Sequence, residues 1–397
     1  MKSEKSIIRG EFFMRLFHLS DLHIGKIVNT YQMLEDQKYI LNCIIREVKD
    51  KKADGVIIAG DLYDIPTPSI GAVQLFDSFI SELSRLGVKV YIVSGNHDSE
   101  ERVAFGSELM SSSGVYMAKP YSGSIHKVTD NSEEVPVNIY LLPYIKPRSV
   151  RGIEGFTDVD SYDSAMRMVL DREVINPDEM NILVAHQFVT GASTCESEER
   201  TIGGIENIDS DAFDKFDYVA LGHIHGPQYI GKNRPGDKGV VIRYSGTPLK
   251  YSFSETAHKK SITVIDIEGK SFSISEIPLV PLHDMAELRG TFEEIMRDDF
   301  RTEVMTDDYV KIILTDEQEI PDVKRLLDRK YSQIMSVFYD NSRTRAESVI
   351  DNTSGVSKEN PIEYISDLYS EQNGMSLDEE QLKFCTDILV ELTEGNV

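Results

Sequence analysis

The feature that most constrains the fold is a regular alternation of short apolar segments and longer amphipathic segments in the first hundred residues. Residues 15–20, 55–59 and 88–93 are short and rich in apolar side chains, as buried strands of a parallel sheet tend to be. Between them, residues 32–49 and 70–86 carry apolar side chains at helical spacing. Strands separated by helices lie parallel and are joined by right-handed crossovers. The alternation therefore predicts an α/β fold.

A second group of predicted strands follows, and its close spacing suggests a second sheet packed on the first. A helix is predicted within this group at residues 162–170. The strands are expected at residues 137–142, 181–185, 218–221, 240–244 and 262–267. Two packed sheets with helices predict one layered domain, which we place at residues 14–275.

The composition changes near residues 276–284, where two prolines in four residues are typical of a linker. Beyond it, residues 308–314 and 336–339 are predicted strands, and Pro321 is expected to open the helix between them. This β-α-β pattern predicts a small separate domain at residues 276–340.

The C-terminal region combines a polar stretch with two amphipathic segments. Residues 341–360 are polar and are expected to be mobile. The segments around 362–369 and 382–392 have helical spacing, and a capping box at Ser376 and Glu379 is predicted to open the second. Short helices are marginally stable alone, so we expect these two to dock, either on their own domain or on a partner.

The N-terminal residues 1–13 show no periodic pattern and are expected to be a disordered extension, with Met14 as an alternative start. Arg9, Glu11 and Arg15 interrupt any apolar core, so this segment does not resemble a secretory signal. No run approaches 18 apolar residues, which predicts that the chain has no transmembrane helix.

The net charge is strongly negative, at −25 from 42 basic and 67 acidic side chains. Such a surface argues against a free-standing nucleic-acid binder and against binding to an anionic membrane. The three cysteines, Cys43, Cys195 and Cys385, are scattered and odd in number, which predicts free thiols and a reducing compartment. We therefore expect a cytoplasmic protein.

Side chains suited to metal binding follow five of the predicted strands directly. Sites in α/β sheets lie beyond the carboxyl ends of the strands, so these residues are expected to converge. Five of the nine histidines belong to this set. In chain order the candidates are Asp21 and His23, Asp61 and Asp64, Asn96, His97 and Asp98, His186, and finally His223 and His225.

The ligand types indicate the class of metal and the roles of two residues. Imidazoles and carboxylates without thiolates suit Mn, Fe or Zn rather than a structural zinc site. Asp61 is the natural bridge between two ions about 3.5–4 Å apart, an arrangement suited to phosphoryl transfer. Because His97 directly follows Asn96, both cannot easily bind one ion. His97 is therefore better suited to donate a proton to a leaving oxygen, or to stabilise developing charge.

The motifs DxH, GDxxD, GNHD and GHxH, in this order and spacing, resemble those of the calcineurin-like metallophosphoesterase superfamily. The sequences around them are similar to the SbcD family, the nuclease subunits of the bacterial SbcCD complex. The resemblance covers roughly residues 14–340, and none of the metal-motif residues departs from the family pattern. The segments that carry it are His18–Lys26, Ala185–Phe188, Ala220–His225, Tyr244–Leu249 and Asp308–Asp316.

The resemblance implies a two-sheet αββα sandwich with a small α+β capping domain that faces DNA and a helical C-terminal tail. It implies two divalent ions, most often Mn²⁺, and His97 as the catalytic histidine. One ion would be held by Asp21, His23, Asp61 and His225, and the other by Asp61, Asn96, His186 and His223. Asp64 and Asp98 are candidates for holding ligands in place, although each could merely cap or stabilise a turn.

The resemblance also implies an activity and partners. The expected activity is Mn-dependent 3′–5′ exonuclease cleavage of duplex DNA and endonuclease cleavage of single strands and hairpins, in end processing, repair, recombination and replication. The expected partners are DNA, a second copy of the chain, and an SbcC-like coiled-coil ATPase bound by residues 341–397.

Two other functions remain open from the sequence. A phosphatase or phosphodiesterase for small molecules would use the same metal set, but would need neither the capping domain nor the tail. A scaffold without activity would not need the complete ligand set. By contrast, the segment Tyr251–Ser254 is interpreted as a buried strand edge that needs no catalytic role.

Overall fold

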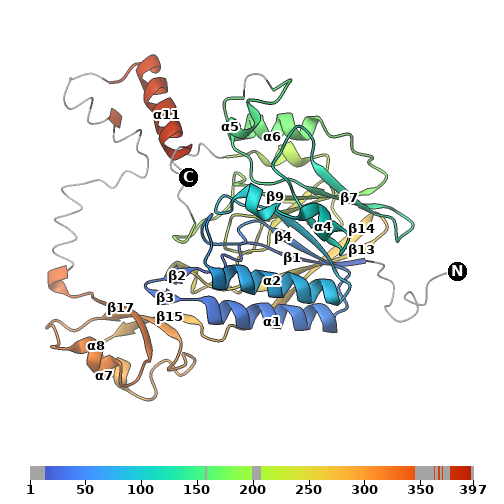
Figure 1. The fold of residues 1–397 in the computed structure, drawn as a ribbon. Helices are drawn as coiled ribbons and strands as arrows, with labels where there is room; N and C mark the ends of the chain where they lie inside the picture. The colour runs from blue at the N-terminus through green and yellow to red at the C-terminus, as the bar shows by residue number, and fades with distance from the viewer. Residues whose placement is uncertain are drawn as a thin grey trace.

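The computed structural model describes residues 14–156, 159–198, 207–344, 362, 365–366, 369 and 376–394. The predictions for residues 1–13 and for most of residues 345–375 lie outside these residues. Within them, the expected two-sheet α/β sandwich is confirmed (Figure 1).

The first sheet has six strands, and its central part is parallel. β1 pairs in parallel with β4, β4 with β5, and β5 with β6, while β13 joins β1 and β14 in antiparallel fashion. The strand order is β14 (Ser271–Pro278), β13 (Ser261–Glu268), β1 (Met14–Leu19), β4 (Gly55–Ala59), β5 (Lys89–Val93) and β6 (Val115–Met117).

The second sheet also has six strands, four of them parallel, with an antiparallel strand at each edge. Parallel strands in the centre of each sheet agree with the buried apolar runs in the sequence. The order is β11 (Gln228–Ile230), β12 (Val241–Tyr244), β10 (Tyr218–Gly222), β9 (Met180–His186), β8 (Val137–Leu141) and β7 (His126–Asp130).

The side chains of β4 show how the layers are built. Val56 and Ile58 pack toward the helices α1 (Leu34–Asp50) and α2 (Ile70–Arg85), which run side by side along the outer face of the first sheet (Figure 1). Ile57 and Ala59 face the second sheet instead. Alternate side chains of a strand point to opposite faces, so one apolar run fills two cores.

Short helices cover the outer face of the second sheet, and two more lie in the segment that follows β5 of the first sheet. A third apolar cluster lies between the second sheet and its helices. These helices are α5 (Pro147–Val150), α6 (Tyr162–Asp171) and η2 (Ser210–Phe213), while α3 (Glu100–Val103) and α4 (Ser107–Ser111) follow β5.

A smaller parallel sheet follows, with the order β15 (Met285–Gly290), β16 (Tyr309–Leu314) and β17 (Gln333–Tyr339). It has its own apolar core, which also takes in residues of α7 (Phe292–Met296) and α8 (Val323–Leu327). The strand β15 was not predicted from the sequence.

The predicted linker at 276–284 begins too early. Glu276–Pro278 complete β14 because they pair with Ser261–Thr263 of β13. The break in regular structure therefore starts only at Leu279.

Polar contacts hold the small sheet against α1 and the hairpin of β2 (Ile27–Val28) and β3 (Tyr31–Gln32). The buried Asp36 carboxylate of α1 accepts hydrogen bonds from the Tyr309 hydroxyl at 2.9 Å and from His283, whose Nδ1 lies 2.9 Å away. The Tyr31 hydroxyl donates to the main-chain oxygen of Ile334 at 3.2 Å.

The C-terminal helix α11 (Glu379–Glu394) confirms the second amphipathic segment, but not its predicted capping box. A cap at Ser376 would make Leu377 the first helical residue, but the helix starts two residues later, at Glu379. Asp378 instead accepts from the Gln381 N–H at 2.8 Å, and Gln381 Oε1 accepts from the Asp378 N–H at 3.1 Å. Among the described helices, none has the length and apolarity needed to cross a membrane.

Candidate metal centre

The candidate ligands lie where the strand ends of the two sheets meet. In the first sheet the candidate ligands follow β1, β4 and β5. In the second sheet they lie at the ends of β9 and β10. A Cβ at Gly222, the last residue of β10, would collide with the main-chain oxygen of Ala59 at the end of β4. Glycine is therefore required there, because the two backbones approach each other too closely for any side chain.

One group of ligands consists of Asp21, His23 and His225, which are all buried. The Nε2 atoms of His23 and His225 lie 3.2 Å apart, and His23 Nε2 lies 3.5 Å from Asp61 Oδ2. Asp21 Oδ1 accepts from the His223 N–H at 2.9 Å, whereas its Oδ2 is buried without a hydrogen-bond partner among the described residues.

The other group lies around the Asn96 side chain. His186 Nε2 and His223 Nδ1 each lie 3.0 Å from Asn96 Oδ1. His186 Nε2 also lies 3.4 Å from Asp61 Oδ2. Asp61 Oδ2 therefore lies within 3.5 Å of a ring nitrogen in each group.

The donor atoms fit a cation better than they fit one another. The Nε2 atoms of His23 and His225 point into one space, 3.2 Å apart, and the buried Asp21 Oδ2 has no hydrogen-bond partner among the described residues. His186 Nδ1 faces the Ala59 carbonyl at 2.9 Å and must donate to it, which directs Nε2 toward Asn96 Oδ1 and Asp61 Oδ2. A cation held there would take the place of a proton on His186 Nε2. Imidazole, carboxylate and amide oxygen without thiolate match Mn, Fe or Zn.

Four of the candidate ligands have a backbone that side chains rarely adopt. The φ angles are 52° for Asp21, 43° for His23, 49° for Asp61 and 103° for His223. Such conformations are costly, and they persist where surrounding contacts enforce them, often at functional sites. Here the His23 N–H donates to the Asp61 carbonyl at 2.9 Å, so two strained turns support each other.

His97 lies beside this cluster with a fixed ring orientation. Its Nδ1 lies 2.8 Å from the main-chain oxygen of Asp64 and must donate to it. Its ring packs edge-on against His23, with centroids 4.8 Å apart. Proton transfer by this ring would therefore use its other nitrogen, Nε2.

The two supporting carboxylates have different surroundings. Asp98 is buried and accepts from the N–H groups of Leu62, Tyr63 and Gly95, so it ties the loop after β4 to the loop after β5. The Asp64 carboxylate pairs with Lys26 at 2.6 Å and lies 3.5 Å from His23 Nδ1. Asp98 therefore connects two loops that carry candidate ligands, and Asp64 lies beside the candidate ligand His23.

Burial and mutual charge shift the pKa values of this cluster. Burial raises the pKa of Asp21 to about 6 and lowers that of His23 and of His223 to about 3. Burial also opposes the charge of His186, but the Asp61 carboxylate outweighs it and raises the pKa of His186 to about 9. Without a cation, this pocket therefore favours neutral His23 and His223, and places a protonated His186 beside an ionised Asp61.

Several residues at the site were not identified from the sequence. The segment Tyr251–Ser254, which was interpreted as a buried strand edge, is not a strand and leads into the short helix η3 (Phe253–Glu255). Tyr251 packs edge-on against His23 at 5.8 Å between ring centroids and donates to the Leu22 carbonyl at 2.6 Å. Behind His225 lies a polar network of the half-buried Ser197 and the buried Glu198, Glu255 and Lys260. These four residues lie outside the motifs that follow the strands, and the sequence around them contains no pattern that links them to His225.

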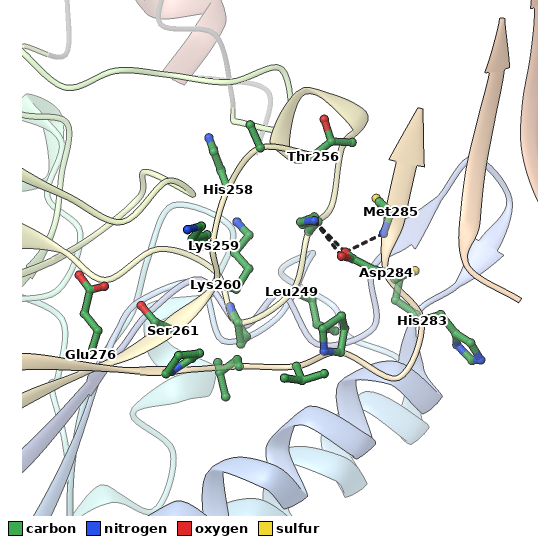
Figure 2. A pocket seen from close by; sticks show the side chains of 18 residues that line it. Leu249, Thr256, His258, Lys259, Lys260, Ser261, Glu276, His283, Asp284 and Met285 are labelled. Carbon is green, nitrogen blue, oxygen red and sulfur yellow. Dashed lines mark hydrogen bonds and ion pairs between the residues drawn. The ribbon is translucent and has the colours of Figure 1, made fainter. Parts of the chain in front are cut away.

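A separate cavity of about 520 Å³ lies between the loop before β13 and the segment that leads into β15 (Figure 2). Its lining is largely apolar, and the ion pair of Lys250 with Asp284 lies within it. None of the candidate ligands lines it, but Lys260 of the network does. This cavity is therefore distinct from the candidate metal centre.

Comparison with known proteins agrees with the site. Residues 14–227 match the calcineurin-like phosphoesterase family, and residues 281–373 match the type 5 capsule protein repressor C-terminal domain family. A protein of Staphylococcus epidermidis, named as the SbcD component of nuclease SbcCD, is 32% identical over 337 residues, which are 83% of this chain and 87% of that protein. The protein of the same name from Staphylococcus saprophyticus is 34% identical over 289 residues, 72% of this chain and 74% of that protein.

A solved structure of a dimetal phosphatase from Danio rerio is also similar, with a TM-score of 0.35 and 12% sequence identity. The match covers 68% of this chain and 100% of the phosphatase chain.

Proposed function

This chain belongs to the SbcD family of calcineurin-like phosphoesterases, and from that premise we propose that it is the DNA-cleaving component of an SbcCD-type complex. The observation that carries the proposal is the convergence of eight side chains from five strand ends on one space at the junction of the two sheets. They are Asp21, His23, Asp61, Asn96, His97, His186, His223 and His225.

We propose that Asp61 is shared between two cation sites. Asp21, His23 and His225 complete one site, since their donor atoms lie close to one another and His23 Nε2 lies 3.5 Å from Asp61 Oδ2. The other site is completed by Asn96, His186 and His223. Two divalent ions, Mn²⁺ in our proposal, would there supply charge to polarise a phosphoryl oxygen and would lower the pKa of a bound water.

The remaining chemistry falls to His97. With Nδ1 held by the Asp64 carbonyl, its Nε2 can donate a proton to the leaving oxygen of a phosphodiester or stabilise charge that develops there. Asp98 keeps the loop that carries His97 in place through its hydrogen bond from Gly95. We propose 3′–5′ exonuclease activity on duplex DNA and endonuclease activity on single strands and hairpins, in repair, recombination and replication.

The substrate class can be tested by comparing a duplex oligonucleotide with a nitrophenyl phosphodiester, both with Mn²⁺. We expect efficient cleavage of the oligonucleotide. Preference for the nitrophenyl ester would support a small-molecule phosphodiesterase instead. Failure to bind any transition metal after incubation with Mn²⁺ would favour a scaffold without activity.

We further propose that residues 341–397 bind an SbcC-like coiled-coil ATPase. The described helix α11 has exposed apolar side chains, with Phe384 at 65% and Leu382 and Ile388 at 39%. With a net charge of −25, the isolated chain should bind DNA weakly, and the partner should supply most of the basic surface. A pull-down with and without residues 341–397 tests the first point, and salt-dependent DNA binding tests the second.

The proposed organisation is a nuclease domain at residues 14–275 and a DNA-facing capping domain at 276–340, in a cytoplasmic homodimer. The free thiols of Cys43, Cys195 and Cys385 are in keeping with the cytoplasm. Light scattering at micromolar concentration tests the dimer, which a monomer mass would contradict.

A further inference from the structure

The network behind His225 determines which of the two ring nitrogens of this histidine is free. His225 comes from the loop after β10, and its Nε2 faces the candidate metal centre, 3.2 Å from His23 Nε2. Its Nδ1 points the other way and lies 2.8 Å from Ser197 Oγ. A neutral imidazole has one N–H, so whichever nitrogen carries the proton, the other is available as a ligand.

The next member of the network settles the direction of the hydrogen bonds. Ser197 Oγ lies 2.5 Å from Glu255 Oε1, and the fully buried Glu255 carboxylate pairs with the Lys260 ammonium at 2.5 Å. Glu255 Oε1 also accepts from the Tyr251 N–H at 3.2 Å. A carboxylate that is paired with an ammonium accepts and does not donate. The single hydroxyl proton of Ser197 must therefore point to Glu255.

The consequence for His225 follows from the proton count. Because the Ser197 proton is given to Glu255, Ser197 Oγ can only accept from His225, and Nδ1 must carry the imidazole proton. Nε2 then keeps its lone pair. We propose that Ser197 and Glu255 are positioning residues that hold His225 in the Nδ1–H form, with Nε2 presented to a metal ion. This rests on the proposed function only in that Nε2 of His225 is a ligand.

Two further contacts show that the network is built around His225. Lys260 Nζ donates to the main-chain oxygen of His225 at 2.9 Å and to Thr247 Oγ1 at 2.6 Å, while its stem lines the neighbouring cavity (Figure 2). Glu198 Oε1 accepts from the His225 N–H at 2.7 Å. The N–H, the carbonyl and the ring of His225 therefore each make a hydrogen bond to this network. Ser197 and Glu198, which are neighbours in one loop, supply two of these contacts.

Ser197 is the right position for the test. Replacing Glu255 would leave the buried Lys260 without its counter-charge, a change that can unfold a protein. Ser197 is only half-buried, so Ser197→Ala removes the hydroxyl while the buried ion pair remains, and Ser197→Thr restores the hydroxyl. Ser254→Ala is a matched control, because Ser254 Oγ accepts from the Glu196 N–H at 3.1 Å and anchors the same loop without touching His225.

The first measurement uses the metal-free full chain labelled with ¹⁵N in histidine, with His225→Gln to assign the signal. We expect wild type, Ser197→Thr and Ser254→Ala to show His225 protonated at Nδ1, and Ser197→Ala to show a mixture of tautomers. An unchanged Nδ1–H form in Ser197→Ala would overturn the inference. This readout needs neither metal nor DNA, so it tests the network even if the proposed nuclease function fails.

The second measurement is equilibrium binding of Mn²⁺. Loss of a residue that orients a ligand typically lowers metal affinity by about 10–100-fold. We expect Ser197→Ala to show that loss at one of two sites, with wild-type affinity at the other and in both Ser197→Thr and Ser254→Ala. Equal weakening in Ser254→Ala, or no recovery in Ser197→Thr, would show that the effect comes from loop packing and would overturn the inference.

Discussion

The Nδ1 atom of His97 lies 2.8 Å from the main-chain oxygen of Asp64, so a main-chain group orients the ring of the proposed catalytic histidine. No substitution at position 64 removes that acceptor. The Asp64 carboxylate meanwhile contacts Lys26 and lies near His23. One residue thus supports two histidines through two different groups.

Replacing His97 should separate catalysis from metal binding. In His97→Asn we expect DNA cleavage with Mn²⁺ to fall by about 10²–10⁴-fold, the usual contribution of a positioned proton donor, with Mn²⁺ stoichiometry unchanged. Steady-state cleavage of a labelled duplex and metal analysis are the measurements. His126→Gln serves as the control, because His126 is exposed and lies outside the cluster. Full activity of His97→Asn would rule out the assigned role.

Replacing Asp61 should remove both metal binding and activity. Its carboxylate lies within 3.5 Å of ring nitrogens in both groups, and Asp61→Asn removes the negative charge that the cations would share. We expect loss of at least one Mn²⁺ per chain and of DNA cleavage. Titration with Mn²⁺, followed by a cleavage assay at the highest concentration, gives the result. Two tightly bound ions in the variant would contradict a bridging role.

Metal removal should lower stability. Without cations the buried Asp21 Oδ2 has no hydrogen-bond partner among the described residues, which is costly. A ligand at one hundred times its dissociation constant stabilises the native state by about 2.7 kcal/mol per site. We therefore expect a lower midpoint of thermal unfolding in EDTA, restored by Mn²⁺. A midpoint that is the same in EDTA and in excess Mn²⁺ would be evidence against a metal centre.

The half-buried Glu100 carboxyl predicts a pH-dependent stability. Burial, and then the charge of Glu101, raise the pKa of Glu100 to about 7, above the value of about 4.3 in an unfolded chain. Between these values the folded state binds the proton more tightly, so stability falls as pH rises through about 7. Glu100→Gln lacks the titrating group and should be more stable than wild type at pH 8.5, with a smaller difference at pH 5.5.

Urea unfolding in EDTA at the two pH values measures this effect. Glu154→Gln is the control, because Glu154 is exposed and the change should matter little at either pH. An advantage of Glu100→Gln that is larger at pH 5.5 than at pH 8.5 would have the wrong sign.

The ligand positions could be predicted from the sequence because each depends on a local rule. A buried apolar strand such as 55–59 ends at Ala59, and the residues that follow it must lie at the carboxyl edge of the sheet. This rule correctly predicted that Asp61 follows the end of β4 and that His186 lies at the end of β9, where it is the last residue. Whether each residue binds a metal remains a proposal.

The rest depends on contacts that no local pattern contains. Ser197 and Glu255 are 58 positions apart, and only the fold shows that both serve His225. The antiparallel insertion of β13 beside β1 joins residues about 250 positions apart, as in the bond of Arg15 to Asp266. The linker was predicted to start too early because Pro278 was taken to lie outside regular structure. Pro278 is instead the last residue of β14, an edge strand, and edge strands tolerate proline.

The meeting of the two sheets at Ala59 and Gly222 also sets an order of events during synthesis. Asp21, His23, Asp61 and Asn96 are made first, but His223 and His225 come only after more than half of the chain has been translated. A nascent chain cannot complete either ligand group before residue 223. The strands that complete the two sheets, β11 to β14, follow His225 in the chain. Both complete ligand groups and both complete sheets therefore depend on segments that are synthesised in the second half of the chain.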